Sequence, residues 1–263
     1  MKKYNILILL LFVIVNVRCS DTVTIDKVTE RDGIVYLNST KKPFTGIVKE
    51  KATKDKEGYE GRFVKGEPEG THKHFTENDS IVLERNFLDG QLHGSFVRNH
   101  INGTDVYNYK HGVKDGEQFE YYDHQRTKIR FYRNFKNGKV DGEMRDYYRN
   151  GNIEELKTFK DGMFHGEHTK YDENGTLRLK EYYVNDERDG LKMEFFKDGD
   201  LCISANYKNG KLHGKYIYYY SEGKKRIEID YVEHKKHGKD IMYYEDGRIN
   251  NIKIYEHGKE VKK

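Results

Sequence analysis

A glycine recurs along most of the chain at a nearly fixed interval, and this interval limits which folds the sequence can adopt. Successive members lie 24, 24, 22, 26, 24, 24, 24 and 24 residues apart. The series comprises Gly46, Gly70, Gly94, Gly116, Gly142, Gly166, Gly190, Gly214 and Gly238. A period of roughly 20–50 residues indicates stacked supersecondary units. Stability is then expected from contacts between neighbouring units and not from one central core.

Two aromatic series keep the same phase as the glycine. The first series consists of Phe63, Phe87, Tyr109, Phe135, Phe159, Tyr183, Tyr207, Tyr231 and Tyr255. The second lies five residues after the glycine and consists of Phe75, Tyr121, Tyr147, Tyr171, Phe195, Tyr219 and Tyr243, with Asn99 as the exception. Three series in phase over about nine units establish a true sequence repeat.

Each unit is predicted to form two strands. Lys215 to Tyr220 is rich in aromatic and β-branched residues, which favour strands. We expect tight hairpins at Asn102-Gly103, Asn150-Gly151, Asn174-Gly175, Asp198-Gly199 and Asp246-Gly247. The paired glycines at the other edge are expected to form a wider turn, with the second glycine at a φ that other residues avoid. The predicted fold is all-β: an elongated antiparallel meander of about nine 24-residue hairpins within residues 33–263.

Residues 1–19 have the pattern of a signal peptide. Lys2 and Lys3 precede an apolar run from Ile6 to Val15, which is too short for a stable transmembrane helix. Residues 20–32 are polar and are expected to be a tether before the repeats. The chain is therefore expected to be exported to the cell envelope.

Cys19 ends this segment and is a candidate lipidation site. A cysteine after an apolar run resembles a bacterial lipoprotein processing site, where the thiol is acylated and attaches the chain to the membrane. Asn16 and Arg18 depart from that pattern, which has Leu three places before the cysteine and a small residue directly before it. Ordinary cleavage after Cys19, giving a periplasmic or secreted protein, remains the alternative.

Charge and cysteine content exclude some classes of function. The chain has 48 Lys and Arg against 44 Asp and Glu, and three of the bases lie within residues 1–19. The remainder carries 45 bases against 44 acids, so no electrostatic footprint for nucleic acid is expected. Cys202 is the only cysteine after Cys19, so no intramolecular disulfide framework is expected.

No set of residues suggests catalysis, a cofactor or a metal. His93, His165, His213 and His237 occupy a turn position that holds Glu or Asp in other units, so they are interpreted as polar turn residues. Nucleophile elbows, phosphate loops and Cys-His pairs with a third member are missing from the sequence. The chain is expected to have no catalytic residue, bound cofactor or metal ligand.

Aromatic residues on a second face are the candidate binding surface. Several units place a second aromatic directly after the Tyr or Phe of the second series, so both faces of the sheet could carry aromatics. Exposed aromatic patches favour partner binding. The candidates are Tyr122, Tyr148, Phe196, Tyr220 and Tyr244. Packing within the sheet is the alternative role for these side chains.

Residues 33–263 resemble the MORN-repeat variant family. The resemblance lies in the YxxGxxxG-type unit followed by paired tyrosines, present in nine phased copies. Tyr36 and the segment Lys42-Pro43-Phe44-Thr45-Gly46 are similar to the start of bacterial proteins of the YwqK-type toxin–antitoxin antitoxin family. These resemblances imply a repeat-built sheet, no catalytic activity and a protein-binding role. For an exported chain they imply immunity toward an exported or cell-surface toxin.

The expected function is therefore non-enzymatic binding of an unidentified protein partner, as an antitoxin or immunity-type factor or as an envelope scaffold. The alternative is an envelope module that binds a glycan or a lipid headgroup by stacking on the aromatics. A lipid-anchored spacer without a specific ligand is a third interpretation.

Overall fold

The computed structural model describes residues 21–261, and the predicted signal peptide and Cys19 lie outside this range. The N-terminal elements are β1 (Asp21–Thr24), the 3-10 helix η1 (Ile25–Lys27), β2 (Val28–Arg31) and β3 (Ile34–Leu37). The strands that follow are β4 (Gly46–Glu50), β5 (Gly58–Val64), β6 (Glu67–Phe75), β7 (Ile81–Leu88), β8 (Gln91–His100), β9 (Gly103–Lys110), β10 (Val113–Lys114), β11 (Gly116–Tyr121), β12 (Ile129–Lys136), β13 (Lys139–Tyr147), β14 (Ile153–Lys160), β15 (Met163–Tyr171), β16 (Leu177–Val184), β17 (Glu187–Arg188), β18 (Gly190–Phe195), β19 (Leu201–Lys208), β20 (Lys211–Tyr219), β21 (Lys225–Val232), β22 (Lys235–Tyr243), β23 (Ile249–Glu256) and β24 (Lys259–Glu260).

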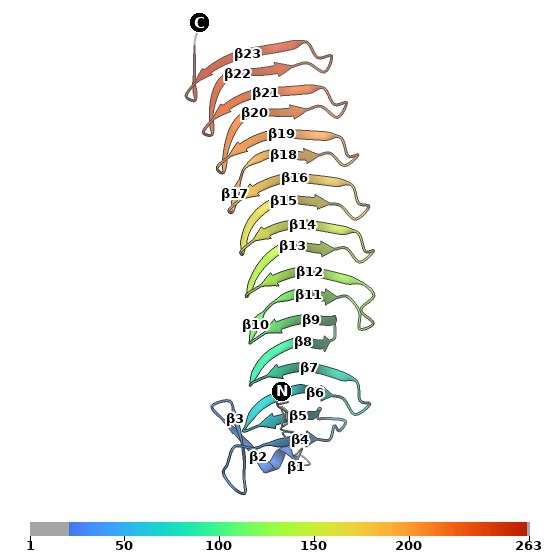
Figure 1. The fold of residues 1–263 in the computed structure, drawn as a ribbon. Helices are drawn as coiled ribbons and strands as arrows, with labels where there is room; N and C mark the ends of the chain where they lie inside the picture. Colours follow the sequence, from blue (N-terminus) through green and yellow to red (C-terminus); the bar gives the residue numbers. More distant parts are fainter. Residues whose placement is uncertain (1–20, 262–263) are drawn as a thin grey trace, which may run out of the picture.

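These strands form one long sheet that follows the chain (Figure 1). From β5 to β23 each long strand pairs antiparallel with its long neighbours in sequence, and the short strands β10, β17 and β24 each pair only with the strand before them. The full sheet has 22 strands, and only β2 and β3 lie outside it as a separate pair. The predicted all-β antiparallel meander is confirmed. No helix within residues 21–261 has the length and apolar character needed to cross a membrane.

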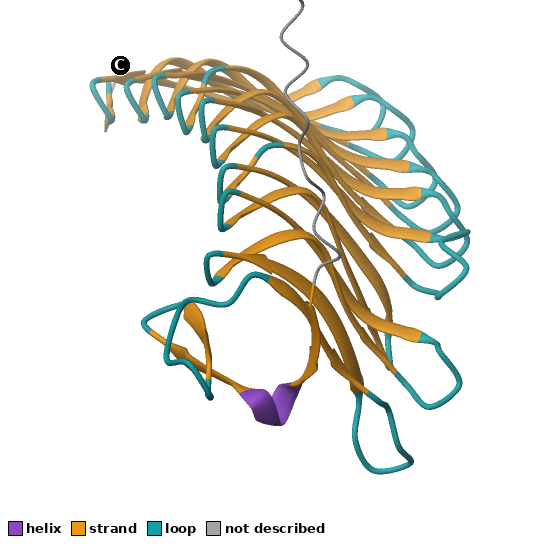
Figure 2. Ribbon diagram, turned by 60° about the horizontal axis from the view of Figure 1, so that its bottom comes forward, coloured by secondary structure: helices purple, strands orange, loops and turns teal. Residues whose placement is uncertain are grey.

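The strands bend, so the sheet forms a trough with one hollow side (Figure 2). Side chains that are paired across antiparallel strands lie on the same face. The face on the inside of the bend, which we call the concave face, carries the first aromatic series, from Phe63 to Tyr255. The second series, including Tyr147 and Tyr219, lies on the opposite, convex face.

The tight hairpins and the wider turns lie at the opposite edges of the sheet from those predicted. Lys208 pairs with Lys211, so Asn209-Gly210 is a two-residue hairpin, and both residues have positive φ, +49° and +74°. A two-residue loop of this kind needs positive φ at both positions, which matches the twist of the strands. The Asn150-Gly151 edge instead forms a loop in which only Gly151 has positive φ, +93°. The prediction of tight hairpins at this edge was therefore wrong for most units.

The phased glycine produces a β-bulge, as its predicted conformation required. Across β12 and β13, Phe135 pairs with Val140 but Arg133 pairs with Met144, so β13 carries extra residues around Gly142. Gly142 has φ +99°, and the Asn134 side chain donates a hydrogen bond to the Asp141 carbonyl at 2.9 Å. The equivalent glycines have φ between +69° and +115°: Gly70, Gly94, Gly116, Gly166, Gly190, Gly214 and Gly238.

The predicted polar tether is wrong, because its described residues form part of the fold. β1 pairs in parallel with β4, from Asp21 opposite Gly46 to Thr24 opposite Lys49. η1, β2 and β3 then lie on the hollow side of the sheet (Figure 2). Three apolar side chains of this segment, Val23, Val28 and Val35, contact the sheet through a cluster containing Val48 and Phe63. We call residues 21–45 the cap.

Fully buried side chains are few, as expected for a repeat array. Beyond residue 63, the buried apolar residues are Val97, Ala205, Ile229 and Ile241. Most side chains of the sheet are half-buried and contact their counterparts on the next strand. Such an array is stabilised by neighbouring contacts.

Candidate functional site

The concave face consists of three rows of side chains that run across the strands. The first series of aromatics forms the row beside the tight turns. Strand pairing places two further rows next to it, one through Arg133, Lys157 and His168 and the other through Phe131, Glu155 and Lys170. These rows change in character along the sheet, and this change divides the concave face into zones.

A charged cluster occupies the middle of the face, where β14, β15 and β16 are adjacent. Glu155 and Glu181 flank His168, with Oε1 of Glu155 2.8 Å from Nε2 and Oε1 of Glu181 3.0 Å from Nδ1. Lys157 and Lys170 also contact Glu155, at 2.8 and 3.1 Å.

Glu181 is bonded at both carboxylate oxygens and is only 3% exposed as a side chain. Arg188 Nε donates to it at 2.7 Å and the Tyr183 hydroxyl at 3.0 Å. Burial alone would raise the pKa of the Glu181 carboxyl, but the hydrogen bonds from His168, Arg188 and Tyr183 outweigh it and lower the pKa to about 2.

The pKa values of the other two acids of this cluster are shifted in opposite directions. Burial also opposes ionisation of Glu155, but bonds from Lys157, His168 and Lys170 bring its pKa to about 2. Asp146 lies opposite Glu155 in the sheet, and burial followed by repulsion from Glu155 raises the pKa of Asp146 to about 6. Hydrogen bonds from Glu155 through His168 and Glu181 to Arg188 join the four strands β14 to β17, whereas Asp146 on β13 has no bonding partner among residues 21–261.

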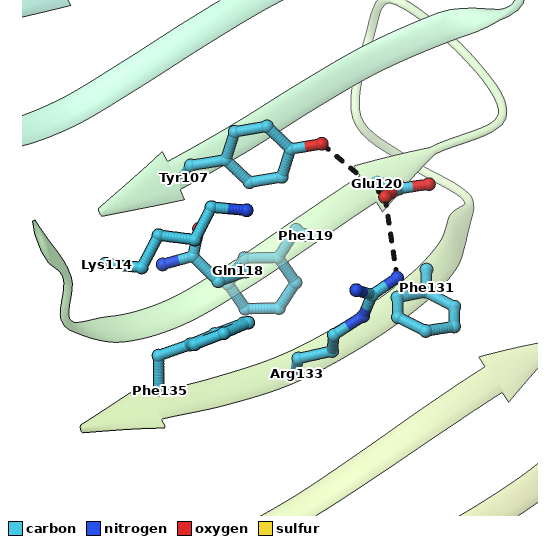
Figure 3. Close-up of a pocket in the computed structure, with 8 residues that line it drawn as sticks. All are labelled: Tyr107, Lys114, Gln118, Phe119, Glu120, Phe131, Arg133 and Phe135. Atoms are coloured by element: carbon cyan, nitrogen blue, oxygen red, sulfur yellow. Dashed lines mark hydrogen bonds and ion pairs between the residues drawn. The ribbon is translucent and has the colours of Figure 1, made fainter. Parts of the chain in front are cut away.

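A small cavity lies next to this cluster on the N-terminal side (Figure 3). Lys114 Nζ sits 4.4 Å from the ring centre of Tyr107, and the Arg133 guanidinium 3.7 Å from that of Phe131. Burial lowers the pKa of Lys114 and raises that of Tyr107 to about 12. The cavity volume of about 50 Å³ accommodates one or two water molecules. We therefore interpret it as a packing gap of the sheet.

An apolar zone follows on the C-terminal side, on β19 to β23. Its three rows carry Ile203, Ala205, Tyr207, Leu212, Tyr216, Tyr218, Ile227, Ile229, Tyr231, Met242 and Tyr255, and on β22 and β23 also Lys236, Asp240, Asn251 and Lys253. The charged side chains of these rows lie on β22 and β23, where Lys236 pairs with Asp240 at 2.6 Å and Lys253 with Glu260 at 3.0 Å. Among residues 21–261 no element covers this zone, whereas the cap covers the other end of the trough (Figures 1 and 2).

The predicted binding tyrosines have a role within the sheet. The hydroxyls of Tyr122, Tyr148 and Tyr220 each donate to a backbone carbonyl of the next unit, in each case at 2.9 Å. Tyr122, Tyr148, Phe196 and Tyr220 are half-buried beside the wider loops. The Tyr244 hydroxyl makes no hydrogen bond within residues 21–261, and this side chain is 49% exposed. The structure thus supplies the packing role that the sequence left as the alternative.

The histidines and the cysteine are also placed by the structure. Within residues 21–261 no three His, Cys, Asp or Glu side chains are arranged to hold a metal ion. His93 contacts His111 edge-on at 4.9 Å, and His237 contacts His257 at 5.2 Å, in both cases between adjacent units. Cys202 is half-buried, and burial raises the pKa of its thiol.

Sequence reasoning missed the charged cluster and the apolar zone, although the period contains a signal for both. Residues 24 apart from Glu155 are Leu179, Ile203 and Ile227, which all lie in one row of the concave face. The position that holds the charged Glu155 is apolar in the later units, and this difference marks the change from the charged cluster to the apolar zone.

Three segments of the chain match the MORN repeat variant, at residues 140–161, 164–185 and 212–233. The matched segments begin 24 and 48 residues apart, so they share the phase of the glycine series. No curated protein matches the chain.

Proposed function

We propose that this MORN-repeat protein is a non-enzymatic binding protein whose partner is another protein, held in the trough by the apolar zone of β19 to β23. The observation that carries the proposal is the uncovered run of aromatic and aliphatic side chains at this end of the concave face. An apolar patch of this kind on a folded surface favours a protein interface. The cluster around His168 supports the non-enzymatic part, because Glu155, His168 and Glu181 are held by hydrogen bonds to one another.

The dimensions of the zone fit an amphipathic helix. Its rows extend from Tyr207 to Ile203 along β19, which is about 13 Å at the usual rise per residue. The five strands from β19 to β23 span about 19 Å at the usual inter-strand spacing. An α-helix with side chains is about 10–12 Å wide, so one helix along the trough would contact all three rows.

The finer version of the proposal is an exported, envelope-located factor of antitoxin or immunity type, anchored through Cys19 or released after cleavage. Its support is the similarity of the opening segment to antitoxin sequences and the signal-peptide pattern of residues 1–19. Stacking of a glycan or lipid headgroup on Tyr216, Tyr218 and Tyr231 is the competing candidate. These three rings are half-buried, and Tyr216 and Tyr231 lie edge-to-face at 6.4 Å.

The test is crosslinked capture from envelope and secreted fractions with a concave-face variant and a matched control. Tyr216→Ser with Tyr218→Ser should reduce recovery of the partner at least tenfold, since buried tyrosines are frequent hot spots worth about 2 kcal/mol. Tyr219→Ser changes the same strand on its convex face and should leave recovery unchanged. Equal recovery with both variants would refute the assignment of this face. Wall glycan or lipid as the main catch would establish the competing candidate.

A further inference from the structure

A cavity of about 450 Å³ lies where the cap meets the concave face. Ile25, Val28 and Val35 of the cap line one side, and Val48, Tyr59 and Phe63 of the sheet line the other. Pockets for small ligands are mostly apolar and usually measure about 300–1,000 Å³. This cavity has that size and lining, and it lies at the opposite end of the trough from the apolar zone.

One cation in the lining lacks a counter-ion. No described carboxylate lies within 4.0 Å of Arg85, and its Nε atom is buried without a hydrogen-bond partner. Its Nη2 atom lies 3.4 Å from His74 Nε2, and its guanidinium 5.7 Å from the Phe87 ring centre. Burial, followed by repulsion from Arg85, lowers the pKa of His74. Arg85 therefore carries a positive charge that a bound anion would neutralise.

The three acids around the cavity do not fill this role. Glu50 pairs with Lys56 at 3.4 Å, and Glu57 lies 3.6 Å from His74 Nδ1. Glu30 is exposed on the cap strand β2. They make the rim acidic, while Arg85 remains the unpaired charge beside the apolar walls. An unsatisfied buried donor is unfavourable, more so on a charged group.

We propose that this cavity binds an aliphatic monocarboxylate, with the carboxylate on Arg85 and the hydrocarbon chain between the cap and the sheet. A planar guanidinium matches a carboxylate through two parallel hydrogen bonds. Six aliphatic and aromatic side chains of the lining offer a surface that suits a hydrocarbon chain, beside the charged side chains. A peptide would require partners for its backbone amides. This site is separate from the apolar zone and does not depend on the partner proposed there.

The test is isothermal titration calorimetry of the full chain with decanoate, in the absence of detergent. We expect one decanoate per chain and no binding of decyltrimethylammonium, which has the same hydrocarbon chain and the opposite charge. Arg85→Gln should weaken decanoate binding about tenfold to a hundredfold, the range expected for a lost hydrogen bond to a charged group. The control is Arg98→Gln, which changes an arginine of the same face that already pairs with Asp105 at 2.5 Å.

Three outcomes would overturn the proposal. They are the absence of decanoate binding, equal binding of the cationic amphiphile, and equal affinity in Arg85→Gln and the native chain. Val28→Trp narrows the cavity from the cap side without touching Arg85, and it should also weaken decanoate binding. If Arg85→Gln disturbs folding, the effect of Val28→Trp on decanoate binding still tests the proposal.

Discussion

Replacing Glu181 by Gln should destabilise the protein at neutral pH and have little effect in acid. Glu181 is buried in the charged cluster and accepts bonds from His168, Arg188 and Tyr183. Its pKa falls from the ordinary 4.5 to about 2 on folding. At about 1.4 kcal/mol per pKa unit, the ionised carboxylate stabilises the folded state by up to about 3 kcal/mol.

The sign of the pH effect follows from the lowered pKa. The contribution of Glu181 is complete above its unfolded value near 4.5 and is lost as the pH falls through about 2. The difference in unfolding free energy between native and Glu181→Gln proteins should thus shrink from about 3 kcal/mol at pH 7 to near zero at pH 2. Urea unfolding followed by circular dichroism at several pH values measures this difference.

Glu167→Gln is the matched control for this prediction. Glu167 lies on the neighbouring strand, β15, and on the convex face, where it pairs with Lys180 at 2.8 Å and is 36% exposed. Exposed ion pairs contribute about 0–1 kcal/mol. The interpretation of the cluster is wrong if both variants lose the same stability, or if the loss in Glu181→Gln does not change between pH 5 and pH 2.

Two further perturbations test the repeat itself. Tyr148→Phe removes the hydroxyl bond to the Tyr171 carbonyl and should lower the unfolding free energy by about 1 kcal/mol. Tyr244→Phe removes an exposed hydroxyl that makes no hydrogen bond within residues 21–261 and should change the unfolding free energy by less than about 0.5 kcal/mol. Equal effects in urea unfolding would argue against a bond between units. Gly142→Ala forces a side chain into φ +99° at the bulge and should cost at least about 1–2 kcal/mol, seen as a lower melting temperature. An unchanged melting temperature would mean that the bulge tolerates other residues.

The turns show that an Asn-Gly pair alone does not determine the turn type, because the type also depends on how the flanking strands pair. Asn-Gly is a strong hairpin signal, and it occurs at both edges of this sheet, as Asn150-Gly151 and as Asn209-Gly210. Only the second forms a two-residue turn, because Lys208 and Lys211 are in register there. Local conformational preference is the same at both places, so the strand register decided between them.

For the tyrosines at the wider loops, too, the sequence alone could not predict whether the side chains are accessible for binding. Their spacing predicted correctly that they follow the strand ends, but accessibility depends on the adjacent unit. The Tyr148 hydroxyl reaches the carbonyl of Tyr171, 23 residues further on, because stacking brings the two loops together. A substitution of these tyrosines would therefore weaken the sheet as well as any surface they form.

The period of the sequence by itself determined the repeat, the two strands per unit, the shared face of Phe63 to Tyr255 and the special backbone of the phased glycines. These features are local or depend only on the spacing between neighbours. Tertiary structure alone decided that residues 21–32 fold back as part of the cap, that His168 lies between Glu155 and Glu181, and that Arg85 faces a cavity without a counter-ion. Those contacts depend on the curvature of the sheet and on which strands become adjacent. The burial of the charged side chains depends on the same two features.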